Sequence, residues 1–141
     1  MGEFSWNSRK MFRVMFEAQA SFRLNRSSKK DIRLKDKTIS GKLLDLSTGG
    51  CGLESPSFLP PGVHLNVFLN RSYLVPEGEK MRKAKYSKIV GIVRTSKQLP
   101  NRKYRLGIQF EKISSEDAKL IRSVIENSER RGDKRITFPN K

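Results

Sequence analysis

Hydrophobic and polar residues alternate one by one over residues 14–24, with every second position apolar. These apolar positions are Val14, Phe16, Ala18, Ala20, Phe22 and Leu24. A period of two indicates a β-strand with one buried face, because successive side chains point to opposite sides of a sheet. The same alternation recurs over residues 63–69. Shorter apolar stretches predict four further strands, around residues 39–46, 52–54, 88–96 and 104–110.

One segment near the C-terminus follows a helical period instead. Its apolar positions lie three or four residues apart or side by side, at Ala118, Ile121, Val124 and Ile125. Ser114 is a suitable N-cap, and Asp117 completes a box-like pattern that suits the positive end of the helix dipole. No β-α-β alternation is present. The pattern therefore predicts a mainly β fold, an antiparallel barrel of six strands closed at one end by a C-terminal α-helix.

A length of 141 residues is that of one domain. Residues 1–8 show no periodicity and are predicted to form a flexible N-terminal segment. Residues 9–127 carry the predicted strands and helix and form the expected domain. Residues 128–141 are mostly polar and are predicted to be a C-terminal tail.

Between the second and third predicted strands lies a polar, glycine-rich turn, Asp45-Leu46-Ser47-Thr48-Gly49-Gly50. Its two glycines favour a sharp turn and let a ligand approach the backbone closely. The carboxylate and the hydroxyl next to them supply hydrogen-bonding groups. Taken alone, this hexapeptide predicts a turn whose aspartate and serine bond their own backbone.

Two arginines upstream change that interpretation. Arg9 and Arg13 are four residues apart and come directly before the first predicted strand. The planar fork of arginine suits both a phosphate and the O6/N7 edge of guanine. The pattern R-x-x-x-R followed by D-x-S-x-x-G, here Arg9 and Arg13 followed by Asp45, Ser47 and Gly50, resembles the signature of the PilZ domain family. The resemblance extends through the strands around residues 90–94 and 104–110 and the helix after them.

This resemblance implies a PilZ-type barrel and a receptor for cyclic di-GMP, a bacterial second messenger with two guanines and two phosphates. It assigns ligand binding to Arg9, Arg13, Asp45, Ser47 and Gly50. The two arginines would fold down over the ligand. Asp45 would accept from guanine N–H groups or hold an arginine, Ser47 would bond a phosphate oxygen or a base edge, and Gly50 would leave room. We expect binding to order the N-terminal segment and so to signal to a partner.

The net charge is +16, from 30 lysines and arginines against 14 acidic residues. Such a field favours anionic partners. We expect an acidic or anionic protein partner, with nucleic acid as the second choice. Two alternatives follow, a basic barrel that binds nucleic acid and a PilZ-like adaptor that binds only proteins. Most aromatic residues fall on predicted core faces, which argues against the first, and the intact motif argues against the second.

The chain offers little for catalysis. A single histidine, His64, and a single cysteine, Cys51, cannot build a usual zinc site, and neither a P-loop nor a G-x-G-x-x-G fingerprint is present. We predict a non-enzymatic protein without a metal or cofactor, with His64 on the surface and Cys51 buried. One cysteine excludes an internal disulfide and fits a reducing cytoplasm, where we expect the protein. No apolar run approaches the roughly 18 residues of a membrane span, and no signal-peptide pattern is present.

Overall fold

The computed structural model describes residues 14–25, 37–74, 86–131 and 135–137. Within them lie seven strands, a short 3₁₀ helix and one α-helix. The strands are β1 (Val14–Leu24), β2 (Ile39–Leu46), β3 (Gly50–Ser55), β4 (His64–Asn70), β5 (Tyr86–Gln98), β6 (Tyr104–Lys112) and β7 (Arg135–Thr137). The 3₁₀ helix, Arg71–Tyr73, follows β4, and the helix α1 (Ser115–Arg131) follows β6.

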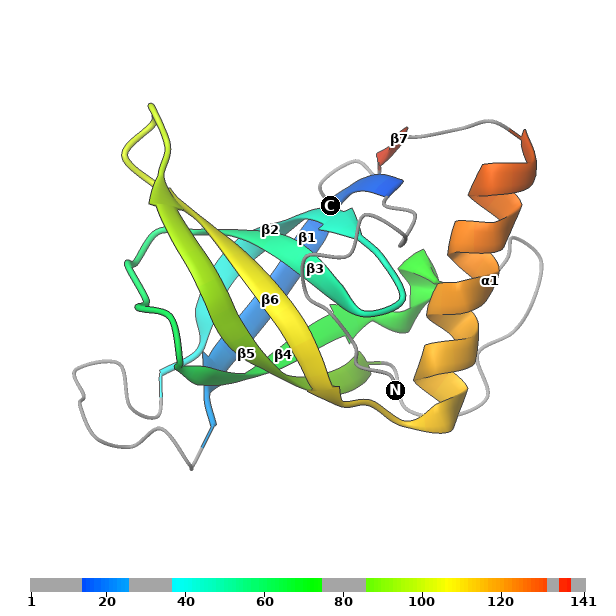
Figure 1. The fold of residues 1–141 in the computed structure, drawn as a ribbon, viewed down its shortest axis with the longest axis horizontal. Helices are drawn as coiled ribbons and strands as arrows, with labels where there is room; N and C mark the ends of the chain where they lie inside the picture. The colour runs from blue at the N-terminus through cyan, green and yellow to red at the C-terminus, as the bar shows by residue number, and fades with distance from the viewer. Residues whose placement is uncertain (1–13, 26–36, 75–85, 132–134, 138–141) are drawn as a thin grey trace.

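Six strands close into a barrel (Figure 1). The ring runs β1-β2-β3-β6-β5-β4 and returns to β1, and every pairing within it is antiparallel. Closure leaves these strands without a free edge. The predicted six-stranded antiparallel barrel with a C-terminal helix is therefore confirmed. In addition, β7 pairs in parallel with the start of β1, with Met15 opposite Arg135 and Glu17 opposite Thr137.

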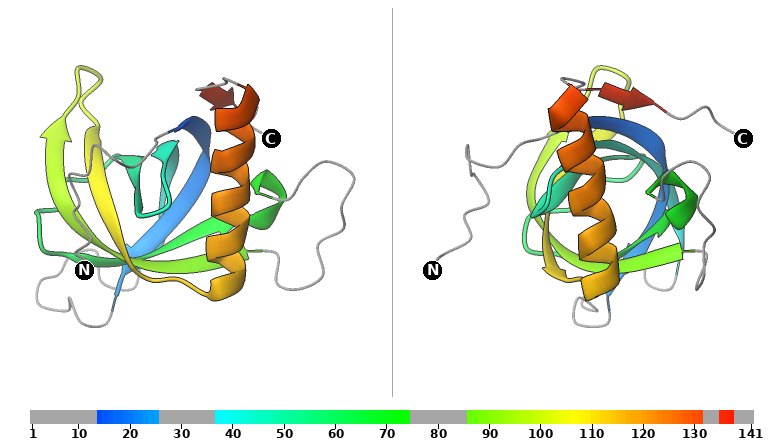
Figure 2. Two further views of the ribbon diagram at one scale, coloured as in Figure 1. Left: turned by 45° about the vertical axis from the view of Figure 1, so that its right-hand side comes forward. Right: turned by 90° about the vertical axis from the view of Figure 1, so that its right-hand side faces the viewer.

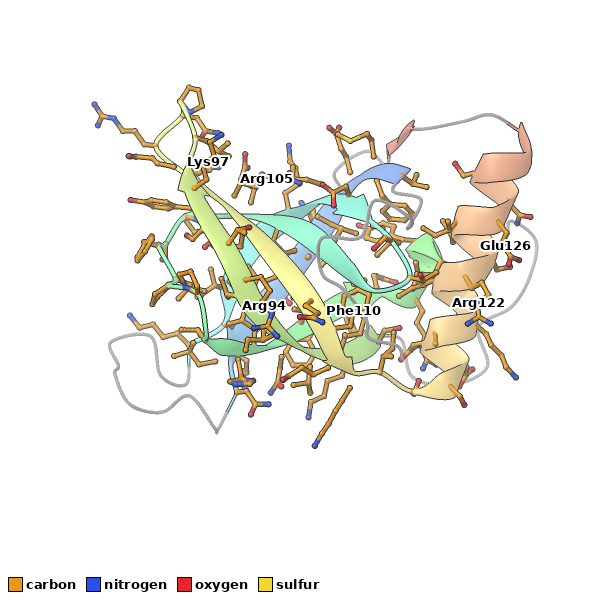
Figure 3. The ribbon with its side chains drawn as sticks, in the orientation of Figure 1. Arg94, Lys97, Arg105, Phe110, Arg122 and Glu126 are labelled. Carbon is orange, nitrogen blue, oxygen red and sulfur yellow. The ribbon has the colours of Figure 1, made fainter. Side chains whose placement is uncertain are left out.

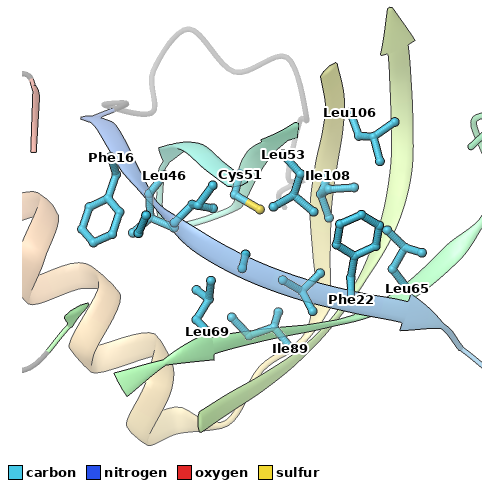
Figure 4. Close-up of a cluster of buried hydrophobic side chains, with 14 of the residues drawn as sticks. Phe16, Phe22, Leu46, Cys51, Leu53, Leu65, Leu69, Ile89, Leu106 and Ile108 are labelled. Carbon is cyan, nitrogen blue, oxygen red and sulfur yellow. The ribbon is translucent and has the colours of Figure 1, made fainter. Parts of the chain in front are cut away.

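The barrel interior is filled by apolar side chains from all six strands (Figure 4). Of the six apolar positions predicted in β1, five are buried and Leu24 is half-buried. Phe16 and Phe22 are the largest of them and are at most 1% exposed. Cys51 is 1% exposed within the same core, as predicted. The period-two pattern thus identified the inner face of β1 correctly, because burial on one face determines that period.

Helix α1 lies across one end of the barrel (Figure 2). Its residues Ile121 and Ile125 belong to the core cluster, so the predicted apolar stripe packs on the barrel. Ser114 caps the helix as predicted, because its Oγ accepts the N–H of Asp117 at 3.0 Å. No described helix is long and apolar enough to cross a membrane.

The helix continues to Arg131, into the stretch that the sequence assigned to the tail. Between Ala118 and Gly132 the chain contains no glycine or proline, so no residue in that stretch interrupts the helix. The short strand β7 also falls in this stretch. It could not be found from periodicity, because three residues are too few to show an alternation.

A buried polar cluster fastens α1 to the barrel. The Asp117 carboxylate accepts hydrogen bonds from Arg71 Nε at 3.1 Å and Ser87 Oγ at 2.6 Å, and Arg71 Nη2 forms an ion pair with it at 3.0 Å. Asp117 is 2% exposed, Arg71 8% and Ser87 fully buried. A charge this buried is tolerated only when it is paired and hydrogen-bonded, so the cluster fixes the helix in one position on the barrel.

Strands β3, β5 and β6 are longer than the apolar pattern predicted. The largest extension is in β5, which continues to Gln98 opposite Tyr104 of β6. Polar residues pair there, including Lys97 with Arg105, and the β5–β6 hairpin projects beyond the barrel in Figure 1. Backbone pairing does not require apolar side chains, so hydrophobic periodicity underestimates the length of such a hairpin.

Candidate ligand-binding site

The turn between β2 and β3 is held by its own hydrogen bonds. The Ser47 N–H donates to the Gly50 carbonyl at 2.9 Å, and the Gly49 N–H donates to Ser47 Oγ at 3.3 Å. The Ser47 hydroxyl in turn donates to the Gly50 carbonyl at 3.3 Å. Ser47 is only 1% exposed. Its side chain therefore makes the local bonds that the sequence predicted for a turn residue.

The same turn is tied to β6, the strand next to β3. The Phe110 N–H on β6 donates to the Gly49 carbonyl at 2.9 Å. Gly50, the first residue of β3, pairs with Gln109 of β6. The glycine-rich turn is thus a fixed part of the barrel wall, anchored at both ends by backbone bonds.

A β-bulge determines where Asp45 lies. Leu43 pairs with Leu53 and Asp45 pairs with Gly52, so β2 contains one more residue than β3 at this point. Because an extra residue reverses the alternation, Leu43 and Leu46 can both lie in the core although they are three positions apart. Asp45 between them lies outside the core cluster.

The carboxylate of Asp45 is paired with Arg105 of β6. Asp45 Oδ2 accepts a hydrogen bond from Arg105 Nη2, and the two groups form an ion pair. The Asp45 side chain is 4% exposed and that of Arg105 is 37% exposed. The pair therefore joins a buried acid to a base that still reaches solvent. Figure 3 shows Arg105 on the same face of the barrel as Arg94.

Gly52 provides the space in which this ion pair forms. A Cβ atom on Gly52 would lie 2.8 Å from Asp45 Oδ2 and 2.8 Å from Arg105 Nη2, closer than real Cβ contacts. Gly52 also pairs with Gly107 of β6, so two neighbouring strands carry no side chain at this level. The Asp45–Arg105 pair therefore lies over a strip of the wall where the backbone carries no side chain, and both glycines are buried.

A second arginine lies near the same strip. Arg94 of β5 is exposed, and its Nε donates to Gln109 Oε1 at 2.6 Å. Thr95, next to Arg94, pairs with Gly107. The wall formed by β3, β6 and β5 thus brings guanidinium groups and a carboxylate to a strip of backbone without side chains. These side-chain groups suit a planar, anionic, hydrogen-bonding ligand.

Of the five residues assigned from the sequence, three come together and two are not described. Asp45, Ser47 and Gly50 lie in or beside one turn. Arg9 and Arg13 lie outside the described residues, as does the N-terminal segment. Sequence reasoning missed Arg105 and Gly52. Alternation in β6 does put Arg105 on the outer face, but only the strand register brings it to Asp45.

The single histidine lies on β4 and the single cysteine on β3. His64 is half-buried on β4, with its Nδ1 2.8 Å from Glu111 Oε1. Cys51 is buried in the core. In the part of the chain that the structure describes, no group of three histidine, cysteine or acidic side chains is arranged to hold a metal ion.

Structures with the same fold come from three bacteria. The Bacillus subtilis inhibitor of motility (MotI/DgrA) has a TM-score of 0.63 at 16% identity, over 89% of this chain and 51% of that one. The PilZ domain of YcgR from Escherichia coli, solved with c-di-GMP, has a TM-score of 0.58 at 16% identity, over 88% and 93%. The K. pneumonia MrkH–c-di-GMP complex has a TM-score of 0.58 at 14% identity, over 89% and 55%.

The present chain thus spans about half the length of MotI/DgrA and MrkH and nearly all of the isolated YcgR domain. No curated protein matches it. The model of the PilZ domain matches residues 11–127, a range that includes Arg13 and the whole Asp45–Gly50 turn. This match covers most of the sequence and agrees with the barrel and the terminal helix. The chain belongs to the PilZ domain family.

Proposed function

We propose that this protein is a non-enzymatic receptor for cyclic di-GMP. The observation that carries the proposal is the carboxylate of Asp45, fixed on the outer wall beside a self-bonded, glycine-rich turn in a PilZ domain. Two structures with the same fold are named as c-di-GMP complexes, which supports the same ligand here. The proposed ligand-binding residues are Arg9, Arg13, Asp45, Ser47 and Gly50.

The proposed roles follow from the chemistry of each group. Asp45, which accepts a hydrogen bond from Arg105, would accept from guanine N–H groups or hold an arginine. Ser47 would bond a phosphate oxygen or a base edge, and its hydrogen bond to Gly50 holds the turn in shape. Gly50 would leave room for the ligand, because it has no side chain. Arg9 and Arg13 would supply the forked donors for phosphate and guanine.

Recognition by directed bonds would make the site selective. Adenine presents an amino donor where guanine presents the O6 acceptor, so cyclic di-AMP should compete poorly for arginine and aspartate placed to read guanine. A site dependent on the +16 charge alone would accept either dinucleotide and would weaken steeply with salt.

A titration tests this proposal against its two alternatives. Calorimetry with cyclic di-GMP, cyclic di-AMP and single-stranded RNA, each at two salt concentrations, separates the three functions. A receptor binds cyclic di-GMP at micromolar concentration and prefers it to the adenine analogue. Tighter, strongly salt-dependent binding of RNA would favour the nucleic-acid barrel, and binding of none of the three would favour the protein adaptor.

The output of binding is also a proposal. We infer that ligand held by Arg9 and Arg13 orders the N-terminal segment and presents it to an acidic or anionic protein, since the +16 charge favours such a partner. A cytoplasmic location fits the lone cysteine and is part of the same proposal.

A further inference from the structure

The ion pair between Asp45 and Arg105 lies at the proposed ligand site, yet Arg105 belongs to neither half of the sequence motif. We propose that Arg105 is a specificity-determining residue, which orients the Asp45 carboxylate and offers its remaining N–H groups to the nucleotide. This inference rests on the proposed function and adds to it a third arginine, contributed by β6.

The burial of Asp45 makes this pairing necessary. With 4% of its side chain exposed, the carboxylate has lost most of its contact with water and needs a charged or hydrogen-bonding partner. Arg105 supplies one from a strand that pairs with β3 and not with β2. It therefore reaches Asp45 across the intervening strand at Gly52. The carboxylate that is proposed to read guanine is thus held in place by a residue 60 positions away in the sequence.

The exposure of Arg105 makes a direct contact with ligand feasible. Its side chain is 37% exposed although Nη2 is bound to Asp45. A guanidinium has five N–H donors in a rigid fork, so bonding at one nitrogen leaves the others to face outward. A fork fixed on one side by a carboxylate loses little conformational entropy when it binds phosphate or the O6/N7 edge of guanine.

A substitution at Gly52 offers a second way to disturb the Asp45–Arg105 pair. Because its missing Cβ would lie 2.8 Å from both Asp45 Oδ2 and Arg105 Nη2, Gly52→Ala should force the two groups apart. Neither charge is removed, and the net charge does not change. The variant therefore separates the effect of the geometry from that of the protein's overall field.

The experiment compares three variants with one control. Arg105→Ala removes the fork, Arg105→Lys keeps the charge but loses the fork, and Gly52→Ala displaces the pair. The control is Lys97→Ala on β5, because Lys97 is exposed and lies directly opposite Arg105 in the ladder. Each variant is checked by circular dichroism, and its affinities for cyclic di-GMP and cyclic di-AMP are then measured by calorimetry.

We expect each of the three variants to lose about tenfold or more in affinity for cyclic di-GMP, and Lys97→Ala to lose about twofold or less. The preference for the guanine ligand over the adenine ligand should fall in the three variants and stay unchanged in the control. A role confined to stabilising the fold would not alter that preference.

Two results would overturn the inference while leaving the receptor in place. In the first, wild-type protein binds cyclic di-GMP, and the folded Arg105→Lys variant binds it with the same affinity and the same preference for guanine. The other is a loss of affinity in all variants, Lys97→Ala included, with an unchanged preference, which is the effect of a diffuse charge. Wild-type protein that binds no cyclic di-GMP would instead refute the proposed function itself. Arg105→Lys keeps a cation beside Asp45, so the test stands even if Arg105→Ala fails to fold.

Discussion

At the scale of single residues, the outer wall of the barrel carries an ion pair whose acid is buried and whose base is partly exposed. Asp45 is nearly inaccessible and fixed by the bulge in β2, whereas Arg105 has one side on Asp45 and the other in solvent. The sequence identified Asp45 because it lies in a recognisable turn. It could not identify Arg105, because a contact between residues 60 positions apart depends on strand register and leaves no local pattern.

Replacement of one motif arginine is the first residue-scale prediction. Arg13→Ala should weaken cyclic di-GMP binding by about 1.5–3 kcal/mol, the range for a hydrogen bond to a charged group. The matched control is Lys10→Ala, which removes the same charge within the same segment but lies outside the motif. Calorimetry on both variants checks the prediction. Equal losses would mean that the segment contributes only its charge.

At the scale of elements, local pattern predicted the strands more accurately than their ends. The limits of β2 agree with the predicted segment, because a strand with one buried face ends where its alternation ends. The extension of β5 and the pairing of β7 with β1 were not predictable. Both depend on which strand lies next to the segment in the sheet, and the hydrophobic period of a segment does not identify its neighbour.

The attachment of helix α1 gives a prediction at this scale. Asp117→Asn keeps the shape of the side chain but leaves the buried Arg71 with only the half-exposed Glu116 as an ionic partner, so the free energy of unfolding should fall by about 3–5 kcal/mol. Glu116→Gln is the control. Glu116 is adjacent and faces the same arginine at 3.8 Å, but its side chain is 46% exposed, so its loss should cost about 0–1 kcal/mol.

Urea denaturation followed by circular dichroism measures both values. If the two variants were destabilised equally, the buried cluster would contribute no more than a surface ion pair, and α1 would be held mainly by the packing of Ile121 and Ile125.

At the scale of the whole molecule, a closed barrel combines with a large positive charge. Closure makes the six strands one unit, so we expect a ligand bound on the outer wall to signal without separating them. The proposed signal therefore lies in the chain outside the ring. This agrees with the sequence, which puts two motif arginines ahead of β1.

Ordering of the N-terminal segment is the prediction at this scale. Adding cyclic di-GMP should change the fluorescence of Trp6, the only tryptophan, and should slow amide exchange across residues 4–13. Exchange within β4, which carries none of the proposed ligand-binding residues, serves as the internal reference. Saturating ligand with no change in exchange across residues 4–13 would show that the segment does not transmit the signal.

The parallel pairing of β7 with β1 has a practical consequence for reporters. Residue 13 leads directly into Val14, while β7 lies against Met15–Glu17, and Met15 itself pairs with Asp45. The start of β1 and the strand β7 therefore meet on one flank of the proposed ligand site. Donor and acceptor fluorophores joined to these two segments would start close together on that flank. An optical sensor for the dinucleotide could thus be built without interrupting any strand of the barrel.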